Sequence, residues 1–144
     1  MSAGIGHLVR LLGEVNDPDL PVLYAHALAF VYPSEYEGFG LQLCEAMATG
    51  YPVLAARATS LPEVLGDGGE LFDLSRPTRL AAQLRAVACD ASFRSNLSER
   101  GRRRALDFSW RRAAAETYRV YRSLTTATAG APSPTSVNDQ RTLT

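Results

Sequence analysis

Two glutamates stand on either side of a glycine-containing turn, and their spacing allows sugar-binding chemistry. Glu37 and Glu45 are separated by seven residues, of which residues 38–40 read Gly-Phe-Gly. Carboxylates accept hydrogen bonds from hydroxyl groups, which sugars and ribose present. If a helix begins at Leu41, Glu45 lies roughly 6 to 8 Å along its axis from that start, since each residue adds about 1.5 Å. The two carboxylates can therefore flank a ligand whose phosphates rest on the turn.

The turn lies between a predicted strand and a predicted helix, where proteins often bind anions. The apolar run 28–32 predicts a buried parallel strand, which Pro33 ends because proline cannot donate to a ladder. The helix from about residue 40 ends at Gly50, with Pro52 just beyond. A helix N-terminus presents unpaired N–H groups and a positive dipole end, and glycines let phosphates approach the backbone. Ligands of open parallel sheets bind beyond the carboxyl ends of the strands, where this turn lies.

A second interpretation of the same residues needs no ligand. Gln42, Glu45 and Thr49 follow the helical spacing i, i+3, i+7, so Glu45 can lie on a solvated helix face. Glu37 can be a surface residue of the turn. From spacing alone, this solvent-exposed interpretation is favoured.

The wider sequence around the two glutamates resembles a known family signature. Residues 33–53 read P-S-E-Y-E-G-F-G-L-Q-L-C-E-A-M-A-T-G-Y-P-V. This segment is similar to the signature of retaining, nucleotide-sugar-dependent glycosyltransferases of the GT-B architecture, family four. Further matches lie at residues 12–15, 19–20, 23–24, 60–64 and 108–110, so the resemblance covers about residues 7–124. The resemblance favours the ligand-binding interpretation of both glutamates.

The resemblance implies a role for each matching residue. Glu37 would be the catalytic residue, contacting donor sugar hydroxyls near the reacting carbon, and Glu45 would hold the ribose hydroxyls. The residues that meet the sugar and the diphosphate through backbone N–H groups would be Gly38, Phe39, Gly40 and Leu41. Family members retain the anomeric configuration and generally need no metal. No cofactor is implied, because the donor, linked to UDP or GDP, is a substrate.

The elements that position these residues alternate along the chain. Strands are predicted at residues 7–15, 28–32, 52–56 and 70–74, with a loop at 66–69. Helices are predicted from an Asp17 cap to Ala27, over 40–50 and 59–65, from Pro77, from a Ser92 cap to about Leu106 with an interruption at Gly101, and from a Ser109 cap. Alternation of this kind predicts a parallel sheet. The predicted fold is therefore α/β: a partial doubly wound, Rossmann-like sheet of about four strands with C-terminal helices, half of a GT-B nucleotide-sugar-binding domain.

The domain organisation follows from the same comparison. Residues 1–124 are expected to form a partial GT-B C-terminal donor-binding domain. Residues 125–144 are rich in Thr, Ala, Ser and Pro without apolar periodicity, and are expected to form a disordered tail. The family's acceptor-binding domain, and the upstream basic residues that stabilise the leaving diphosphate, have no counterpart in this sequence. We therefore expect a fragment that needs a missing N-terminal domain or a partner chain.

Charge is unevenly distributed, although the net charge is zero. Residues 1–75 carry ten acids and two arginines, whereas residues 76–144 carry thirteen arginines and five acids. The densest basic group comprises Arg100, Arg102, Arg103, Arg104, Arg111 and Arg112. Such a group can meet an anionic membrane surface or nucleic acid, but a solvated helix face is the favoured interpretation. No nucleic-acid motif accompanies it, so no nucleic-acid partner is expected.

The cellular setting is expected to be the cytoplasm, with peripheral contact at the inner face of a membrane as an alternative. No apolar run approaches roughly 18 residues, so no membrane span is predicted. The first residues lack the basic and apolar regions of a signal peptide. Cys44 and Cys89 have no metal-site spacing to His7 or His26, and each is interpreted as a small core residue of a helix.

The function expected from the sequence is that of a glycosyltransferase fragment. It would bind a nucleotide-diphosphate sugar and transfer the glycosyl group, with retention, to an unknown acceptor. The alternative is a non-catalytic nucleotide-binding or protein-interaction remnant of such an enzyme.

Overall fold

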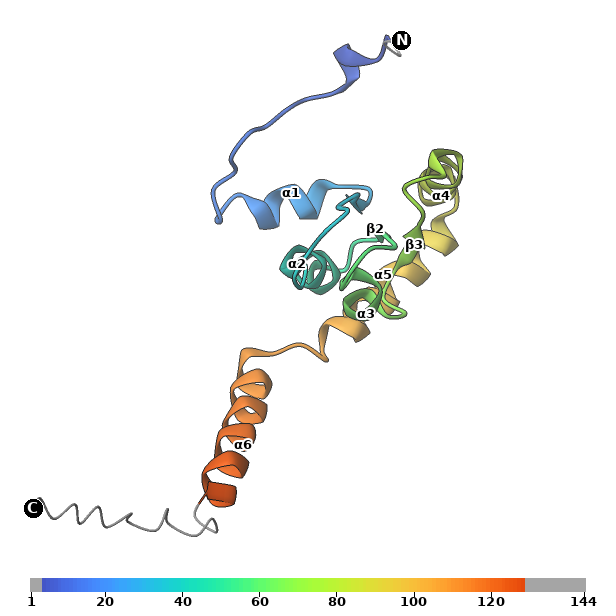
Figure 1. Cartoon of the computed structure of the whole chain (residues 1–144). Coiled ribbons are helices and arrows are strands. Elements are labelled where there is room, and N and C mark those ends of the chain that lie inside the picture. The colour runs from blue at the N-terminus through green and yellow to red at the C-terminus, as the bar shows by residue number, and fades with distance from the viewer. Residues whose placement is uncertain (1–3, 129–144) are drawn as a thin grey trace, which may run out of the picture. The chain divides into compact units, whose positions relative to one another are not determined.

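The chain consists of two compact units, Met1–Phe108 and Ser109–Thr144. A computed structural model describes the backbone of residues 4–128 and the side chains of residues 4–125. Figure 1 shows the helices and strands in chain order. The residues that the sequence singles out as a candidate site all lie in the first unit.

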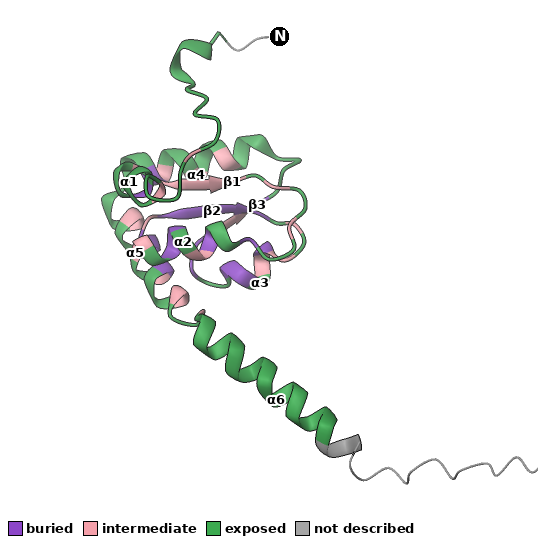
Figure 2. Cartoon of the chain, turned by 90° about the vertical axis from the view of Figure 1, so that its left-hand side faces the viewer, coloured by how far each residue is buried: buried purple, intermediate pink, exposed green. Residues whose placement is uncertain are grey.

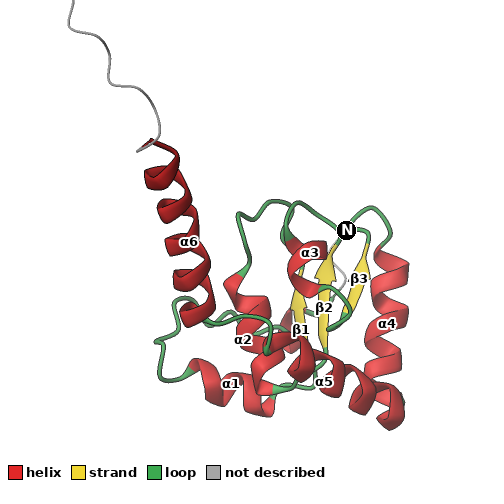
Figure 3. Ribbon diagram, turned by 90° about the horizontal axis from the view of Figure 1, so that it is seen from below, coloured by secondary structure: helices red, strands yellow, loops and turns green. Residues whose placement is uncertain are grey.

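The first unit is built around a parallel sheet, drawn as arrows in Figure 3. Its strands are β1 (Phe30–Tyr32), β2 (Val53–Ala56) and β3 (Glu70–Phe72), in the order β1-β2-β3. Phe30 pairs with Val53, and Leu54 pairs with Glu70. Parallel strands need a crossover connection, and here α2 joins β1 to β2 while α3 joins β2 to β3. All three strands therefore end at the same edge of the sheet.

Helices surround this sheet in the first unit. They are α1 (Leu20–His26), α2 (Leu41–Thr49), α3 (Leu61–Leu65), α4 (Pro77–Cys89) and α5 (Ala91–Ala105), after the short 3-10 turn η1 (Gly6–Leu8). A single residue, Asp90, separates α4 from α5. Its backbone N–H donates to the Ala86 carbonyl at 2.8 Å, and its carboxylate accepts from the Phe93 N–H at 2.9 Å. Asp90 therefore closes one helix and caps the next.

The hydrophobic core is centred on β2, whose four residues are all buried. Figure 2 shows buried residues along β2, α2 and α3. The largest buried side chains around this strand are Leu43, Met47, Leu61, Leu65, Phe72, Val87 and Leu97. These side chains come from four helices and from β3, so burial of apolar surface joins the elements into one body.

The α/β class and its parallel sheet are confirmed, as are the strands predicted at 28–32, 52–56 and 70–74, each with shorter bounds. The end of α2 is also as predicted. Gly50 adopts a left-handed backbone with φ of +79°, and its N–H bonds to the Ala46 and Met47 carbonyls. A residue with a Cβ would be strained in this conformation, which explains the glycine.

The strand predicted at residues 7–15 is wrong. Residues 6–8 form η1, and residues 9–15 join no strand of the sheet. Leu8, Leu11 and Leu12 are exposed. A strand needs a hydrogen-bonding neighbour, and within residues 4–128 both β1 and β3 pair only with β2. The described sheet consequently has three strands rather than about four.

Two helix starts differ from the prediction. α1 begins at Leu20 instead of directly after Asp17, which puts Pro21 in its first turn, where a missing N–H is tolerated. α5 is capped by Asp90 rather than Ser92, since α4 continues to residue 89.

Gly101 does not interrupt α5, contrary to the prediction. It is buried where α5 packs against α2 and the loop before β3. A Cβ at this position would lie 3.2 Å from the Gly68 carbonyl oxygen and 3.6 Å from Met47. Glycine is therefore retained here for close packing, in spite of its low helix propensity.

The second unit contains one helix in its described part, α6 (Trp110–Thr128). The predicted cap is confirmed, because the Arg112 N–H donates to the Ser109 hydroxyl at 3.1 Å. Trp110, Tyr118 and Tyr121 are exposed. The helix continues past residue 125, and residues 129–144 of the predicted tail lie outside the described residues.

The described helices include none that is long and apolar enough to cross a membrane.

Both cysteines lie in helices, as predicted, but Cys89 is exposed at the end of α4 and is not a core residue. Cys44 is half-buried in α2 and packs against the core.

Candidate functional site

The candidate site lies at the carboxyl edge of the sheet, where the chain leaves β1 and β2. The segment after β1 carries Glu37 and the Gly-Phe-Gly turn, and leads into α2. The segment after β2 carries Thr59 and Ser60, and leads into α3. Hydrogen bonds join the two segments, so residues far apart in the sequence form one surface.

The carboxylate of Glu37 is held through one of its oxygens. The Tyr32 hydroxyl donates to Oε1 at 2.6 Å, and the Ser34 hydroxyl donates to the same oxygen at 2.9 Å. These two hydrogen bonds, with the Tyr32 bond contributing more, lower the pKa of Glu37 below its ordinary value. No hydrogen bond to Oε2 occurs within the described residues. The side chain is therefore an oriented, ionised acceptor with one oxygen available to a ligand.

Tyr32 connects this carboxylate to the sheet and to α2. It is the last residue of β1 and is half-buried. Burial, and then the hydrogen bond to Glu37, raise the pKa of Tyr32 to about 12. The Tyr32 hydroxyl also contacts the Gln42 side chain at 3.2 Å. Tyr32 therefore stays protonated and donates to Glu37 at neutral pH.

The glycine turn brings the backbone of residues 38–40 to the start of α2. Gly40 adopts φ of +89°, and a Cβ there would lie 2.8 Å from Leu61 Cδ2. Gly38 is open, with no atom within 4 Å of a Cβ built on it. Among residues 4–125, no side chain caps the N-terminus of α2. Its first N–H groups can therefore donate to an anionic ligand.

Phe39, between the two glycines, is supported from the end of the first unit. Its ring meets that of Phe108 edge to face, with centroids 5.8 Å apart and an angle of 84° between the planes. The Arg104 guanidinium lies 4.8 Å from the centre of the Phe108 ring. Phe39 nevertheless remains 44% exposed. The Phe39 ring is therefore held in place by Phe108 and is still partly accessible to solvent.

Glu45 and Leu41 lie on α2 beyond the turn, and both are exposed. Burial, and then the nearby charge of Glu45, raise the pKa of Tyr24 in α1. Within the described residues, no hydrogen bond joins Glu45 to Glu37. The structure thus groups Glu37 with the turn, and places the Glu45 charge near Tyr24 of α1.

Two arginines of the basic cluster bind carbonyl groups within the first unit. Arg100 donates from Nε to the Asp67 carbonyl at 2.6 Å and pairs with Glu70 at 3.2 Å. Arg104 donates to the carbonyls of Glu63 and Val64 at the end of α3. Cations are favourable at the negative end of a helix dipole. These two arginines, at least, anchor loops rather than present charge to a partner.

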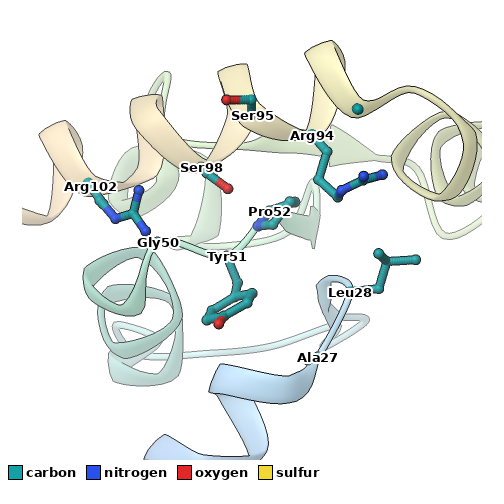
Figure 4. Close-up of a pocket in the computed structure, with 10 residues that line it drawn as sticks. Ala27, Leu28, Gly50, Tyr51, Pro52, Arg94, Ser95, Ser98 and Arg102 are labelled. Atoms are coloured by element: carbon teal, nitrogen blue, oxygen red, sulfur yellow. The ribbon is translucent and has the colours of Figure 1, made fainter.

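A cavity of about 330 Å³ lies at the opposite edge of the sheet (Figure 4). It is lined by residues that precede β1 and β2, including Leu28 and Pro52, and by Ser98 from α5. Arg94, in its wall, donates to the Val87 carbonyl at 2.6 Å, and Arg102 lies directly against Gly50 at the end of α2. Both arginines thus contact the C-terminal end of a helix. None of the predicted site residues lines this cavity.

Sequence reasoning missed the hydroxyl residues that hold the site. Tyr32, Ser34, Thr59 and Ser60 all contact Glu37 or its neighbours. The available signal was their position, since each lies at or just after the carboxyl end of a strand. Across residues 4–128, no group of three or more His, Cys, Asp or Glu residues could hold a metal ion.

Known protein families and individual proteins share sequence similarity with this chain. The profile of the family described as "Glycosyl transferases group 1" matches residues 1–104. The chain is 45% identical over 116 residues to the O-antigen chain mannosyltransferase B of Escherichia coli, covering 81% of this chain and 30% of that protein. It is 41% identical over 122 residues to the MMP alpha-(1->4)-mannosyltransferase of Mycolicibacterium hassiacum, covering 82% of this chain and 30% of that protein.

A solved structure also matches the fold. The sucrose-phosphate synthase from Thermosynechococcus elongatus superposes with a TM-score of 0.76 at 32% sequence identity. The match covers 85% of this chain and 32% of the synthase. The chain therefore spans about 30% of the length of the relatives that it matches.

Proposed function

The chain belongs to the glycosyl transferases group 1 family, and from this membership we propose that it forms the donor-binding part of a retaining glycosyltransferase. In the whole enzyme it would bind a nucleotide-diphosphate sugar, and the glycosyl group would pass to an acceptor held by other parts. One observation carries the proposal: the Glu37 carboxylate is fixed through Oε1, with its second oxygen available beside an uncapped helix N-terminus.

Each element of the site has a proposed task. The available oxygen of Glu37 would accept a hydrogen bond from a donor sugar hydroxyl near the reacting carbon. Backbone N–H groups of Gly38, Phe39, Gly40 and Leu41 would meet the sugar and the diphosphate. The positive end of α2 would stabilise charge that develops on the leaving diphosphate. Glu45 would accept hydrogen bonds from the ribose hydroxyls.

The relatives suggest which donors to examine first. Two of them are named as mannosyltransferases, so mannose conjugates of GDP and UDP are the first donors to titrate, followed by other hexose conjugates. The proposed setting is the cytoplasm, with peripheral membrane contact as an alternative.

Calorimetric titration of the full chain with GDP, UDP and their mannose conjugates tests the proposal. Glu45→Ala should weaken nucleotide binding by about 1–3 kcal/mol, the scale of lost charge-assisted hydrogen bonds. Glu35→Ala is the control, since Glu35 is an exposed acid in the loop that leads from β1 into α2.

The outcomes separate the two candidate functions. Binding that Glu45→Ala weakens and Glu35→Ala leaves intact supports a donor site with Glu45 at the ribose. Equal affinity in wild type and Glu45→Ala contradicts the ribose role. Absence of binding by a sample that circular dichroism shows to be folded contradicts the donor-site proposal for this chain. That result favours the alternative function, a non-catalytic nucleotide-binding or protein-interaction remnant of such an enzyme.

A further inference from the structure

We propose that Thr59 and Ser60 are positioning residues of this site, which hold the backbone around Glu37 so that its carboxylate and the glycine turn face the same ligand. The inference rests on the proposed function and extends it to the segment after β2. It concerns residues that touch Glu37 and the turn rather than residues that touch the donor.

Three hydrogen bonds connect the two segments. The Glu37 N–H donates to Thr59 Oγ1 at 3.0 Å. The Ser60 hydroxyl lies 3.1 Å from the Glu37 carbonyl oxygen and 3.2 Å from the Phe39 carbonyl oxygen, and donates to this pair. Both backbone polar groups of Glu37 are thereby bonded to side chains from another loop. The position of Glu37 consequently depends on residues more than twenty places away in the sequence.

Thr59 adopts an unusual backbone conformation to make its bond. Its φ is +43°, and among the described residues it is the one non-glycine with a positive φ. Such a conformation is unfavourable for a β-branched residue and persists only where the surroundings require it. Strained residues of this kind cluster at functional sites. Here the observed partner of the strained residue is the N–H of the proposed catalytic glutamate.

The next residue of the same segment supports the turn directly. A Cβ added to Gly40 would lie only 2.8 Å from Leu61 Cδ2. The glycine turn therefore packs closely against the start of α3. We call residues 59–61 the platform. The platform fixes the backbone of Glu37 from one side, while Tyr32 and Ser34 orient its carboxylate from the other. Both constraints are needed to place a sugar contact and a phosphate contact on one ligand.

The test compares variants that remove one hydroxyl at a time from the full chain. Thr59→Val keeps the β-branched shape and loses the acceptor, whereas Thr59→Ser keeps the acceptor. Ser60→Ala removes the second hydroxyl. Thr59→Gly also loses the acceptor but accommodates the positive φ, which provides a folded variant if valine does not fold. Thr78→Val, at an exposed position on α4, is the matched control.

The first readout is affinity for a nucleotide sugar compared with affinity for the parent nucleoside, which lacks the groups that the turn and Glu37 would contact. Thr59→Val, Thr59→Gly and Ser60→Ala should each weaken binding of GDP-mannose or UDP-mannose about two- to tenfold, the scale of one hydrogen bond. Binding of guanosine or uridine should be unchanged. Thr59→Ser and Thr78→Val should bind both ligands as wild type does.

The second readout is hydrogen exchange of the Glu37 amide, which needs no ligand. Exchange should be about two- to tenfold faster in Thr59→Val than in wild type, and restored in Thr59→Ser. If wild type binds no nucleotide sugar, the proposed function fails, and this exchange still decides whether the platform holds Glu37. Unchanged exchange in Thr59→Val, or equal losses of nucleoside and nucleotide-sugar affinity, would overturn the positioning role.

Discussion

At the scale of single residues, the site is a carboxylate whose surroundings are mostly hydroxyl groups. Motif and spacing pointed to Glu37 and the glycine turn, and these residue roles stay predictions. The hydroxyls of Tyr32, Thr59 and Ser60 could not be found in the same way. Their contacts with Glu37 depend on how β1 and β2 end side by side, and on a backbone conformation at Thr59 that its residue type disfavours.

The hydrogen bond between Tyr32 and Glu37 predicts that the pKa of Tyr32 changes when Glu37 is replaced. Glu37→Gln removes the carboxylate charge that favours the protonated hydroxyl. The pKa of Tyr32 should therefore fall from about 12 towards its ordinary value of 10.0. Spectrophotometric titration of tyrosinate measures this change. Glu35→Gln is the control, and an identical titration curve for wild type and Glu37→Gln would show that the hydrogen bond is absent in solution.

The same pair predicts how stability depends on alkaline pH. A hydroxyl whose pKa is higher in the folded state stabilises that state below the unfolded pKa. This contribution is lost as the pH rises through the folded value. For Tyr32 the window is from 10.0 to about 12. Urea unfolding at a series of pH values should show a fall in the free energy of unfolding across this window, smaller in Glu37→Gln. Parallel curves for the two proteins would contradict the assignment.

At the scale of elements, apolar periodicity predicted the strands and helices of the first unit well, but not which residue begins each helix. Asp90 and Ser92 are both good caps, and the sequence between them does not decide the choice. The end of α4 determines the cap. Because α4 continues to Cys89 and α5 begins at Ala91, Asp90 is the residue left to cap α5. The strand predicted at residues 7–15 failed for a similar reason, because its apolar pattern has no neighbouring strand in the described sheet.

The cap assignment can be tested by paired substitutions. Asp90→Ala should lower the free energy of unfolding by about 1 kcal/mol, because it leaves the Phe93 N–H without its acceptor. Ser92→Ala should have almost no effect, since Ser92 is exposed in the first turn of α5. Urea denaturation followed by circular dichroism compares the two. A larger loss for Ser92→Ala would show that α5 begins later than the structure indicates.

At the scale of the whole molecule, the buried apolar core belongs to the first unit. Its members run from Tyr24 to Leu97, whereas Trp110, Tyr118 and Tyr121 of α6 are exposed. Aromatic residues at helical spacing are typical of a core face, but the described residues do not bury those of α6. Periodicity identifies an apolar face, but it does not say what covers that face.

A shortened chain tests the independence of the first unit. A protein that ends at Phe108 should unfold cooperatively, with a urea midpoint close to that of the full chain, because it keeps every buried apolar core residue. An isolated helix of the length of α6 is only marginally stable in water, so its removal should lower the helical signal without broadening the transition. A lost or strongly shifted transition would show that the second unit stabilises the first.

The one-residue junction at Asp90 has a consequence for which insertions the fold accepts. The rotation of α5 about its own axis is fixed by its contacts. Leu97 is buried in the core, while Arg100 and Arg104 bond to the segments around α3 and β3. One residue added within this helical run would turn everything after it by about 100° and advance it by about 1.5 Å. The added residue must instead bulge outwards, which breaks the shared cap. This junction should therefore accept changes of side chain far more readily than changes of length.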